Sequence, residues 1–105
     1  MGGGGATSGT WGQRWTSENN LQSHFGAPRH HGRQMGYSNA QQYSRGATNN
    51  IFNPNTIVGN SLNQDGRVGY FNRITGRLTI VNANGRIITY FTPDKGREYF
   101  NEHFG

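Results

Sequence analysis

The C-terminal part of the chain constrains its fold most, because it is predicted to form three consecutive short strands. These are Arg67–Asn72, Gly76–Asn82 and Gly85–Thr92. The first connection is a hairpin loop, and the second ends in Asn84-Gly85, a pair that accepts positive φ. Consecutive strands with such short connections predict a small twisted antiparallel sheet.

Alternation along the third of these strands sorts its side chains into two sets. Ile87, Thr89 and Phe91 are expected to share one face of the sheet, and Ile88 and Tyr90 the other. Both sets contain apolar residues, so the pattern does not assign the core to one face.

Helices are expected before the sheet. Ser17 is predicted to cap the first helix, which would run to about Phe25 and stop before Pro28. Ser38 is predicted to cap a second helix, which should fade by Asn49-Asn50. Helices followed by hairpin-linked strands indicate an α+β fold class.

The remaining segments of the domain are rich in turn residues. Arg29–Gly36 is predicted to be a loop, and Thr56–Val58 is a candidate for a further short strand. Lys95–Phe104 is expected to hold at most one short helix, because Pro93 ends the strand before it.

The N-terminal region has the composition of a tether. Residues 1–16 are rich in Gly, Ser and Thr and are predicted to be a flexible segment or junction, followed by one domain over 17–105. Trp11 and Trp15 are nevertheless expected to pack onto that domain. Met1–Ala6 lacks the charged-then-apolar order of a signal peptide.

Composition limits the classes of protein to consider. The chain has 105 residues and an apolar fraction of 30%, which allows one domain with a modest core. No apolar run approaches the ~20 residues of a membrane span. The absence of cysteine excludes disulfide scaffolds, cysteine nucleophiles and thiolate zinc sites.

Basic residues outnumber acidic ones, which indicates that the partner is a polyanion. The formal net charge is +5, and of the 10 basic residues only Lys95 is a lysine. Arginine presents a planar fork that holds phosphate through two hydrogen bonds. Nucleic acid is therefore the leading partner class, and the alternatives are a basic but merely soluble domain or one that docks on an acidic protein.

Three histidines are the candidates for proton transfer. His24, His30 and His31 lie close together in the sequence, and imidazole titrates near neutrality. Cleavage of RNA without a metal needs a base for the ribose 2′-hydroxyl, an acid for the leaving 5′-oxygen and cations for the charged phosphorane. The alternative is that they are ordinary exposed loop residues. A zinc site is not predicted, because His103 is remote in sequence and no fourth ligand accompanies the three.

Polar residues of the last strand and the C-terminal segment are candidates for contacts with a phosphate. Arg86 can clamp a phosphate oxygen, and the hydroxyls of Thr89 and Tyr99 can donate to it. The alternative is the ordinary preference of strands for Thr and Tyr.

Aromatic and basic residues interleave along the C-terminal half, as in surfaces that bind unpaired nucleotides. Phe71, Phe91 and Phe100 are assigned to the core instead. The predicted RNA-binding residues are Arg29, Arg33, Arg73, Arg77, Tyr90, Lys95 and Arg97.

Several short motifs occur in an order that resembles a known group of proteins. They are Leu21–Phe25 (Leu-x-x-His-Phe), His31-Gly32, Tyr37–Tyr43 (Tyr-Ser-x-Ala-x-x-Tyr), Gly76–Pro93 and Glu98–Phe100. The order resembles the C-terminal toxin domains of bacterial polymorphic toxins, such as those of contact-dependent inhibition and Rhs effectors. These domains belong to the barnase/EndoU/colicin/RelE (BECR) superfamily of metal-independent ribonucleases.

The resemblance implies N-terminal helices packed on a small twisted antiparallel sheet, with RNA cleaved on its open side and no cofactor. It also implies an immunity protein, expected to be acidic, that blocks the cleft. By position it assigns functional roles to His31, Thr89 and Tyr99. One departure concerns the phosphate clamp: relatives often carry Arg where this chain has Ile88, so Arg86 or Arg73 would supply the cation.

Together these observations predict an endoribonuclease toxin that cleaves tRNA or another structured RNA and leaves a 2′,3′-cyclic phosphate. His31 is the main acid/base candidate, with His24 or His30 as the second proton carrier. The domain would be delivered to act in the cytoplasm of a target cell. The alternatives are a non-catalytic RNA-binding module and a protein-interaction domain.

Overall fold

The computed structural model describes residues 15–105 of the chain. Its elements are α2 (Glu18–Phe25), α3 (His31–Gln34), α4 (Ala40–Phe52), β1 (Thr56–Asn60), β2 (Val68–Asn72), β3 (Leu78–Val81), β4 (Ile87–Phe91) and α5 (Arg97–His103). The strands form one antiparallel sheet in the order β1-β2-β3-β4. The predicted α+β class and the predicted strands are confirmed.

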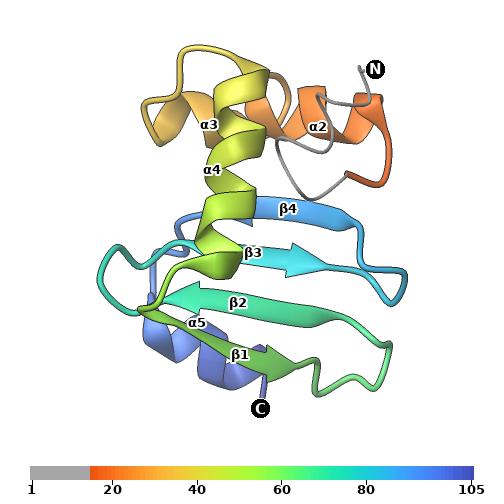
Figure 1. Ribbon diagram of the computed structural model, residues 1–105, viewed down its shortest axis with the longest axis vertical. Helices are drawn as coiled ribbons and strands as arrows, with labels where there is room; N and C mark the ends of the chain where they lie inside the picture. The colour runs from red at the N-terminus through yellow and green to blue at the C-terminus, as the bar shows by residue number, and fades with distance from the viewer. Residues whose placement is uncertain (1–14) are drawn as a thin grey trace.

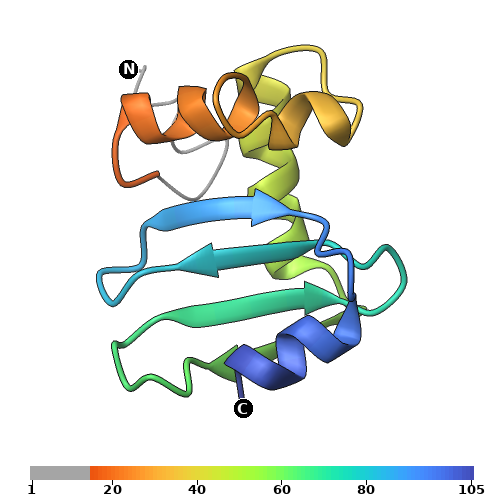
Figure 2. The same cartoon turned by 180° about the vertical axis from the view of Figure 1, so that it is seen from behind.

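The helices lie on both sides of the sheet. Helix α4 crosses one face, and α2 and α3 lie beside the β4 edge (Figure 1). From behind, α5 lies over the β1–β2 part of the opposite face, and none of the helices within residues 15–105 covers β4 on that side (Figure 2). None of the described helices has the length and hydropathy that a bilayer crossing requires.

Helix boundaries follow local capping chemistry. The Ser17 hydroxyl accepts the backbone N–H of Asn20 at 3.0 Å, which confirms Ser17 as the first N-cap. The second helix is capped by Asn39 and not by the predicted Ser38, because the Asn39 side chain accepts the N–H of Gln42. That helix runs to Phe52, beyond the predicted end, and stops where Pro54 favours extended backbone at Asn53.

The prediction of a continuous loop over 29–36 is wrong, because residues 31–34 form the short helix α3. Gly32 is buried, and a β-carbon there would collide with the rings of Phe25 and Tyr43. Tertiary packing, which carries no local sequence signal, therefore stabilises this turn of helix against α2 and α4.

The predicted facing of the last strand is also wrong, because β4 contains a bulge. Val81 pairs with Ile87 and Ile80 with Thr89, so Ile88 is the extra residue. Ile87 consequently packs with Tyr90 on the α4 side, and Ile88 packs on the opposite side.

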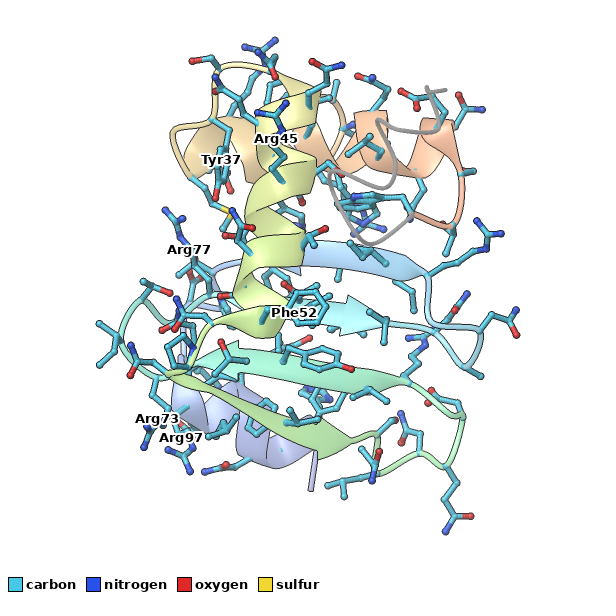
Figure 3. The ribbon with its side chains drawn as sticks, viewed as in Figure 1. Tyr37, Arg45, Phe52, Arg73, Arg77 and Arg97 are labelled. Carbon is cyan, nitrogen blue, oxygen red and sulfur yellow. The ribbon has the colours of Figure 1, made fainter. Side chains whose placement is uncertain are left out.

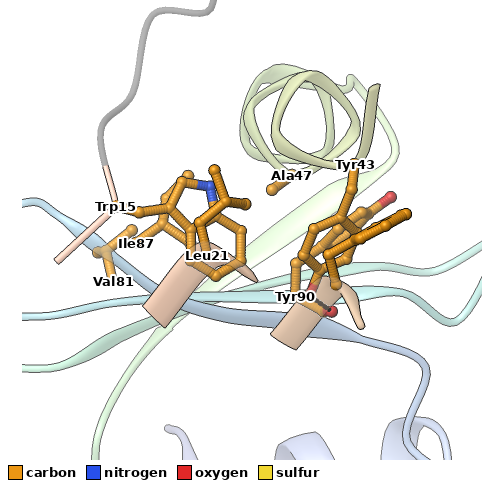
Figure 4. Close-up of a cluster of buried hydrophobic side chains, with 8 residues drawn as sticks. Trp15, Leu21, Tyr43, Ala47, Val81, Ile87 and Tyr90 are labelled. Atoms are coloured by element: carbon orange, nitrogen blue, oxygen red, sulfur yellow. Dashed lines mark hydrogen bonds between the residues drawn. The ribbon is translucent and has the colours of Figure 1, made fainter. Parts of the chain in front are cut away.

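Two apolar clusters sandwich the sheet. The one beneath α4 contains Trp15, Leu21, Phe25, Tyr43, Ala47, Val81, Ile87 and Tyr90 (Figure 4). The one beneath α5 contains Phe71, Leu78, Ile80, Phe100 and Phe104. Phe71 and Phe100 are core residues as predicted, and Phe91 packs half-buried at the edge of the second cluster.

Trp15 belongs to the folded unit. It is only 7% exposed, and its indole N–H donates to the Ser44 hydroxyl at 3.1 Å. The expected packing of Trp15 onto the domain is thus confirmed, whereas Trp11 and the rest of the Gly-rich segment lie outside the described residues.

A polar seam inside the helix–sheet interface fixes α4 on the sheet. The Asn50 amide donates to the carbonyls of Tyr70 (3.1 Å) and Arg77 (3.2 Å) and to the Thr79 hydroxyl (3.2 Å). The Thr79 hydroxyl in turn donates to the Ala47 carbonyl at 3.0 Å. These bonds fix the register of α4 over β2 and β3.

Replacing Asn50 by Ala is expected to lower the free energy of unfolding by about 2–3 kcal/mol, because buried acceptors lose their donor. Urea unfolding followed by circular dichroism measures the difference. Asn49→Ala, at the exposed neighbouring position, is the matched control and should change stability by less than ~0.5 kcal/mol. Equal effects of the two substitutions would contradict the role of the seam.

Candidate active site

A cleft of about 820 Å³ lies beside the C-terminal end of β4. Helix α3, the β2–β3 hairpin and the β4–α5 connection surround it. It is lined by His31, Gln34, Met35, Thr75, Arg77, Phe91, Thr92, Pro93, Asp94, Lys95 and Tyr99. We call it the His31 cleft.

Helix α3 presents His31 to this cleft. Its ring stacks on Phe91, with centroids 5.2 Å apart and planes at 29°. The ring of His24, on α2, lies 5.7 Å away on centroids. His31 makes no hydrogen bond to any residue in the described range, so its ring nitrogens are available to a ligand.

Both histidines are held in the neutral form. Burial is the main cause that lowers the pKa of His31, and the neighbouring His24 and Arg29 lower it further. Burial and Arg29 also lower the pKa of His24, although its Nδ1–H donates to the Asn20 carbonyl at 2.8 Å and opposes the shift. At neutral pH, His31 is therefore an unprotonated imidazole, which can accept a proton.

Arg77 is the cation that the fold fixes at this cleft. Its guanidinium lies 5.6 Å from the centroid of the Tyr37 ring and donates to the Tyr37 hydroxyl at 3.1 Å and to the Met35 carbonyl at 3.4 Å. The Nε–H has no partner among the described residues. A guanidinium held this way is preorganised to bind an anion through its remaining donors.

The hydroxyl of Tyr90 supports this arrangement from within the core. It lies 3.0 Å from the Tyr37 hydroxyl, and burial is the main cause that raises its pKa. Tyr90 is 2% exposed, so the prediction that its ring stacks on RNA bases is wrong.

Lys95 and Tyr99 complete the cleft from the α5 side. Lys95 is exposed in the β4–α5 connection, and the ring of Tyr99 stands edge-on to Phe91 with centroids 5.6 Å apart. The ring of His103 lies 4.3 Å from that of Tyr99. His103 was not a candidate in the sequence analysis because it is remote in sequence from the other histidines. In the structure it contacts Tyr99, because the two residues lie four positions apart on one face of α5.

Two predicted residues near β4 are not brought to the cleft. Arg86 precedes β4 and Phe91 ends it, so roughly 16 Å of extended chain, at ~3.3 Å per residue, separates them. Thr89 pairs with Ile80 in the middle of β4, an edge strand of the sheet, and is not among the lining residues. The phosphate clamp predicted at Arg86 is therefore not in the His31 cleft, which Arg77 lines instead.

The predicted site residues near α3, other than His31, do not line the His31 cleft. His30 is exposed, caps α3 with a positive φ of 62°, and does not line the cleft. Arg33 lies over the Phe25 ring at 5.0 Å, and Arg29 acts on the cleft through its charge.

Two further predicted RNA-binding arginines belong to segments that border the cleft, Arg73 to the β2–β3 hairpin and Arg97 to the start of α5. In the view of Figure 3 both are drawn at the same side as Arg77 and below it. Both are exposed. With Lys95 and Arg77 they make this end of the molecule basic. Within residues 15–105, no three His, Asp or Glu side chains form a group that could hold a metal ion.

Comparison with solved structures relates the fold to a ribonuclease. The chain is similar to a ribonuclease from Escherichia coli complexed with its inhibitor protein, with a TM-score of 0.53 and 20% sequence identity. The likeness covers 77% of this chain and 95% of that one, so the two proteins share a fold. No family model and no curated protein matches the sequence.

Replacing Arg29 by Gln is expected to raise the pKa of both His24 and His31, because the Arg29 charge is one cause that lowers each. NMR titration of the ring resonances measures both values. Arg33→Gln removes an equally exposed arginine and should leave them nearly unchanged. Equal shifts in the two variants would show that net charge, and not Arg29, acts on the pair.

Proposed function

We propose that the protein is a metal-independent endoribonuclease that cuts RNA through attack of a ribose 2′-hydroxyl on the adjacent phosphate. The observation that carries this proposal is the presence of a neutral imidazole, His31, in the same cleft as the cations Arg77 and Lys95. The fold shared with a bacterial ribonuclease supports it.

Each chemical need of the reaction has a candidate in the cleft. His31 takes the proton of the 2′-hydroxyl while the 2′-oxygen forms its bond to phosphorus. Arg77 and Lys95 stabilise the doubly charged phosphorane. The bond to the 5′-oxygen then breaks, and the Tyr99 hydroxyl and the Lys95 ammonium are the donors at hand to protonate that oxygen. The product end is a 2′,3′-cyclic phosphate.

The basic end of the molecule favours a structured RNA with an accessible loop. Arg73 and Arg97 extend the positive surface beyond the cleft and can hold phosphates on either side of the cut. Aromatic rings and a cleft suit unpaired nucleotides, because a regular RNA duplex buries its base edges. We propose tRNA or a similarly folded RNA as the substrate.

We further propose a cognate inhibitor with an acidic surface that occupies the His31 cleft. A toxic nuclease needs such protection in the cell that makes it, and the ribonuclease of shared fold is complexed with an inhibitor protein. A net charge of +5 favours an acidic partner. In this proposal the domain is a delivered effector of the polymorphic-toxin type, acting in the cytoplasm of a target cell.

Replacing His31 by Gln is expected to lower the rate of RNA cleavage by about 100-fold or more, the usual loss when a general base is removed. A gel of tRNA incubated with protein and EDTA measures it. The parallel variant His30→Asn keeps a residue that tolerates positive φ and should lose far less activity. Undiminished cleavage by His31→Gln would remove it from the mechanism, and RNA binding without cleavage by the wild type would favour a binding module.

The cleavage rate is expected to fall with acidification only at a pH below 6.5, the ordinary pKa of histidine. His31 must be unprotonated to act as the base, so its lowered pKa moves the acidic limb of the rate profile to lower pH. Single-turnover rates between pH 4.5 and 8 on one RNA measure the profile. An acidic limb above pH 7 would contradict the assignment of His31 as the base.

A further inference from the structure

A second, smaller hollow adjoins the His31 cleft at the β2–β3 hairpin. Its volume is about 180 Å³. Four asparagines line it: Asn49 and Asn50 of α4, Asn53 at its C-cap, and Asn72 at the end of β2. We call it the amide pocket.

The groups left free in the amide pocket are mostly hydrogen-bond donors. The Oδ1 of Asn72 already accepts the N–H groups of Ile74 and Thr75, and the Oδ1 of Asn53 accepts that of Asn55. The Nδ2 groups of Asn53 and Asn72 make no hydrogen bond to the described residues. Asn72 is only 4% exposed, and its Nδ2 group is a donor that the pocket leaves for a ligand or water.

Asn49 adds a complete amide at the mouth of the pocket. Its side chain is exposed and bonds to none of the residues that the structure describes. Its NH₂ group adds two further donors at the mouth, beside those of Asn53 and Asn72. No carboxylate lines the pocket, so nothing there repels a polyanion.

The amide pocket and the His31 cleft share two lining residues, Thr75 and Arg77. Arg77 lies between the two hollows and is fixed there by Tyr37 and Met35. A nucleotide whose phosphate is held by Arg77 in the cleft therefore has a polar hollow for its base next to that phosphate. Unpaired bases can also stack on the plane of a guanidinium.

We propose that the amide pocket binds uracil, the base with two exocyclic carbonyl oxygens, from the unpaired RNA segment that enters the His31 cleft. The donors of Asn53, Asn72 and Asn49 pair with these oxygens, whereas guanine and cytosine carry one such oxygen each and adenine carries none. This inference rests on the proposed ribonuclease function and adds its base specificity.

The test uses short 2′-O-methyl oligonucleotides that cannot be cleaved, because the attacking hydroxyl is blocked. Fluorescein-labelled pentamers A-A-X-A-A, with X as A, C, G or U, are titrated with the protein and followed by anisotropy. Two neutral hydrogen bonds predict that X = U binds about tenfold more tightly than X = A, with G and C between them. Equal affinities for all four bases would overturn the proposal.

The matched variants are Asn49→Ala, in the pocket, and Gln41→Ala, an exposed position elsewhere on α4. Asn49→Ala is expected to reduce the preference for U over A about three- to fivefold, and Gln41→Ala to preserve it. A preference that survives Asn49→Ala and an added Asn53→Ala would place base recognition elsewhere.

The binding assay separates this inference from the proposed function. If the protein cleaves RNA but binds all four oligonucleotides equally, the proposal for the amide pocket is wrong and the proposed ribonuclease function is unaffected. If the protein shows a base preference in binding but does not cleave ordinary RNA, the ribonuclease function is wrong and base recognition by the pocket is unaffected.

Discussion

The buried ring of Tyr43 is the contact on which the rest of the structure depends. It is inaccessible to solvent and lies 5.3–6.0 Å, on ring centroids, from Trp15, Phe25, Tyr37 and Tyr90. Its hydroxyl donates to the backbone carbonyl of Tyr90, and burial raises its pKa, so the proton remains. One side chain of α4 thus joins the N-terminal segment, α2 and β4 (Figure 4).

The candidate site follows from this packing. Gly32 lies against Phe25 and Tyr43, and the absence of a side chain there lets α3 come close enough to stack His31 on Phe91. The same approach half-buries His31, which lowers its pKa. The loop after α3 then carries Met35 and Tyr37, which position Arg77. A core contact in this way influences both the protonation state of His31 and the position of the Arg77 guanidinium.

Local sequence signals were sufficient for the elements but not for the site. The strands could be predicted because turn residues flank them in the sequence. The role of Ser17 as an N-cap could be predicted because a cap acts within one helical turn. The bulge at Ile88 could not, since it depends on how β3 and β4 pair. Arg86 is close to Thr89 in sequence, but the fold does not bring it to the His31 cleft. Arg77 lines the cleft because the β2–β3 hairpin and the loop after α3 pack together, and no local sequence pattern reveals that packing.

The amide pocket was missed for a related reason. Each of its asparagines has a local explanation as a turn or cap residue, and only the packing of α4 on the β2–β3 hairpin brings them together. Residues that the sequence predicted as functional by chemical type, such as His30 and Tyr90, lie outside the cleft or inside the core instead.

The central claim is that His31 and Arg77 act on the same phosphate in one transition state. A double-mutant cycle with His31→Gln, Arg77→Gln and the combined variant tests it most directly, through single-turnover cleavage of one RNA in EDTA. Each single change is expected to cost about 100-fold, and the double change little more than either, because groups that act together are strongly non-additive. A double variant whose loss equals the product of the two single losses would contradict the account.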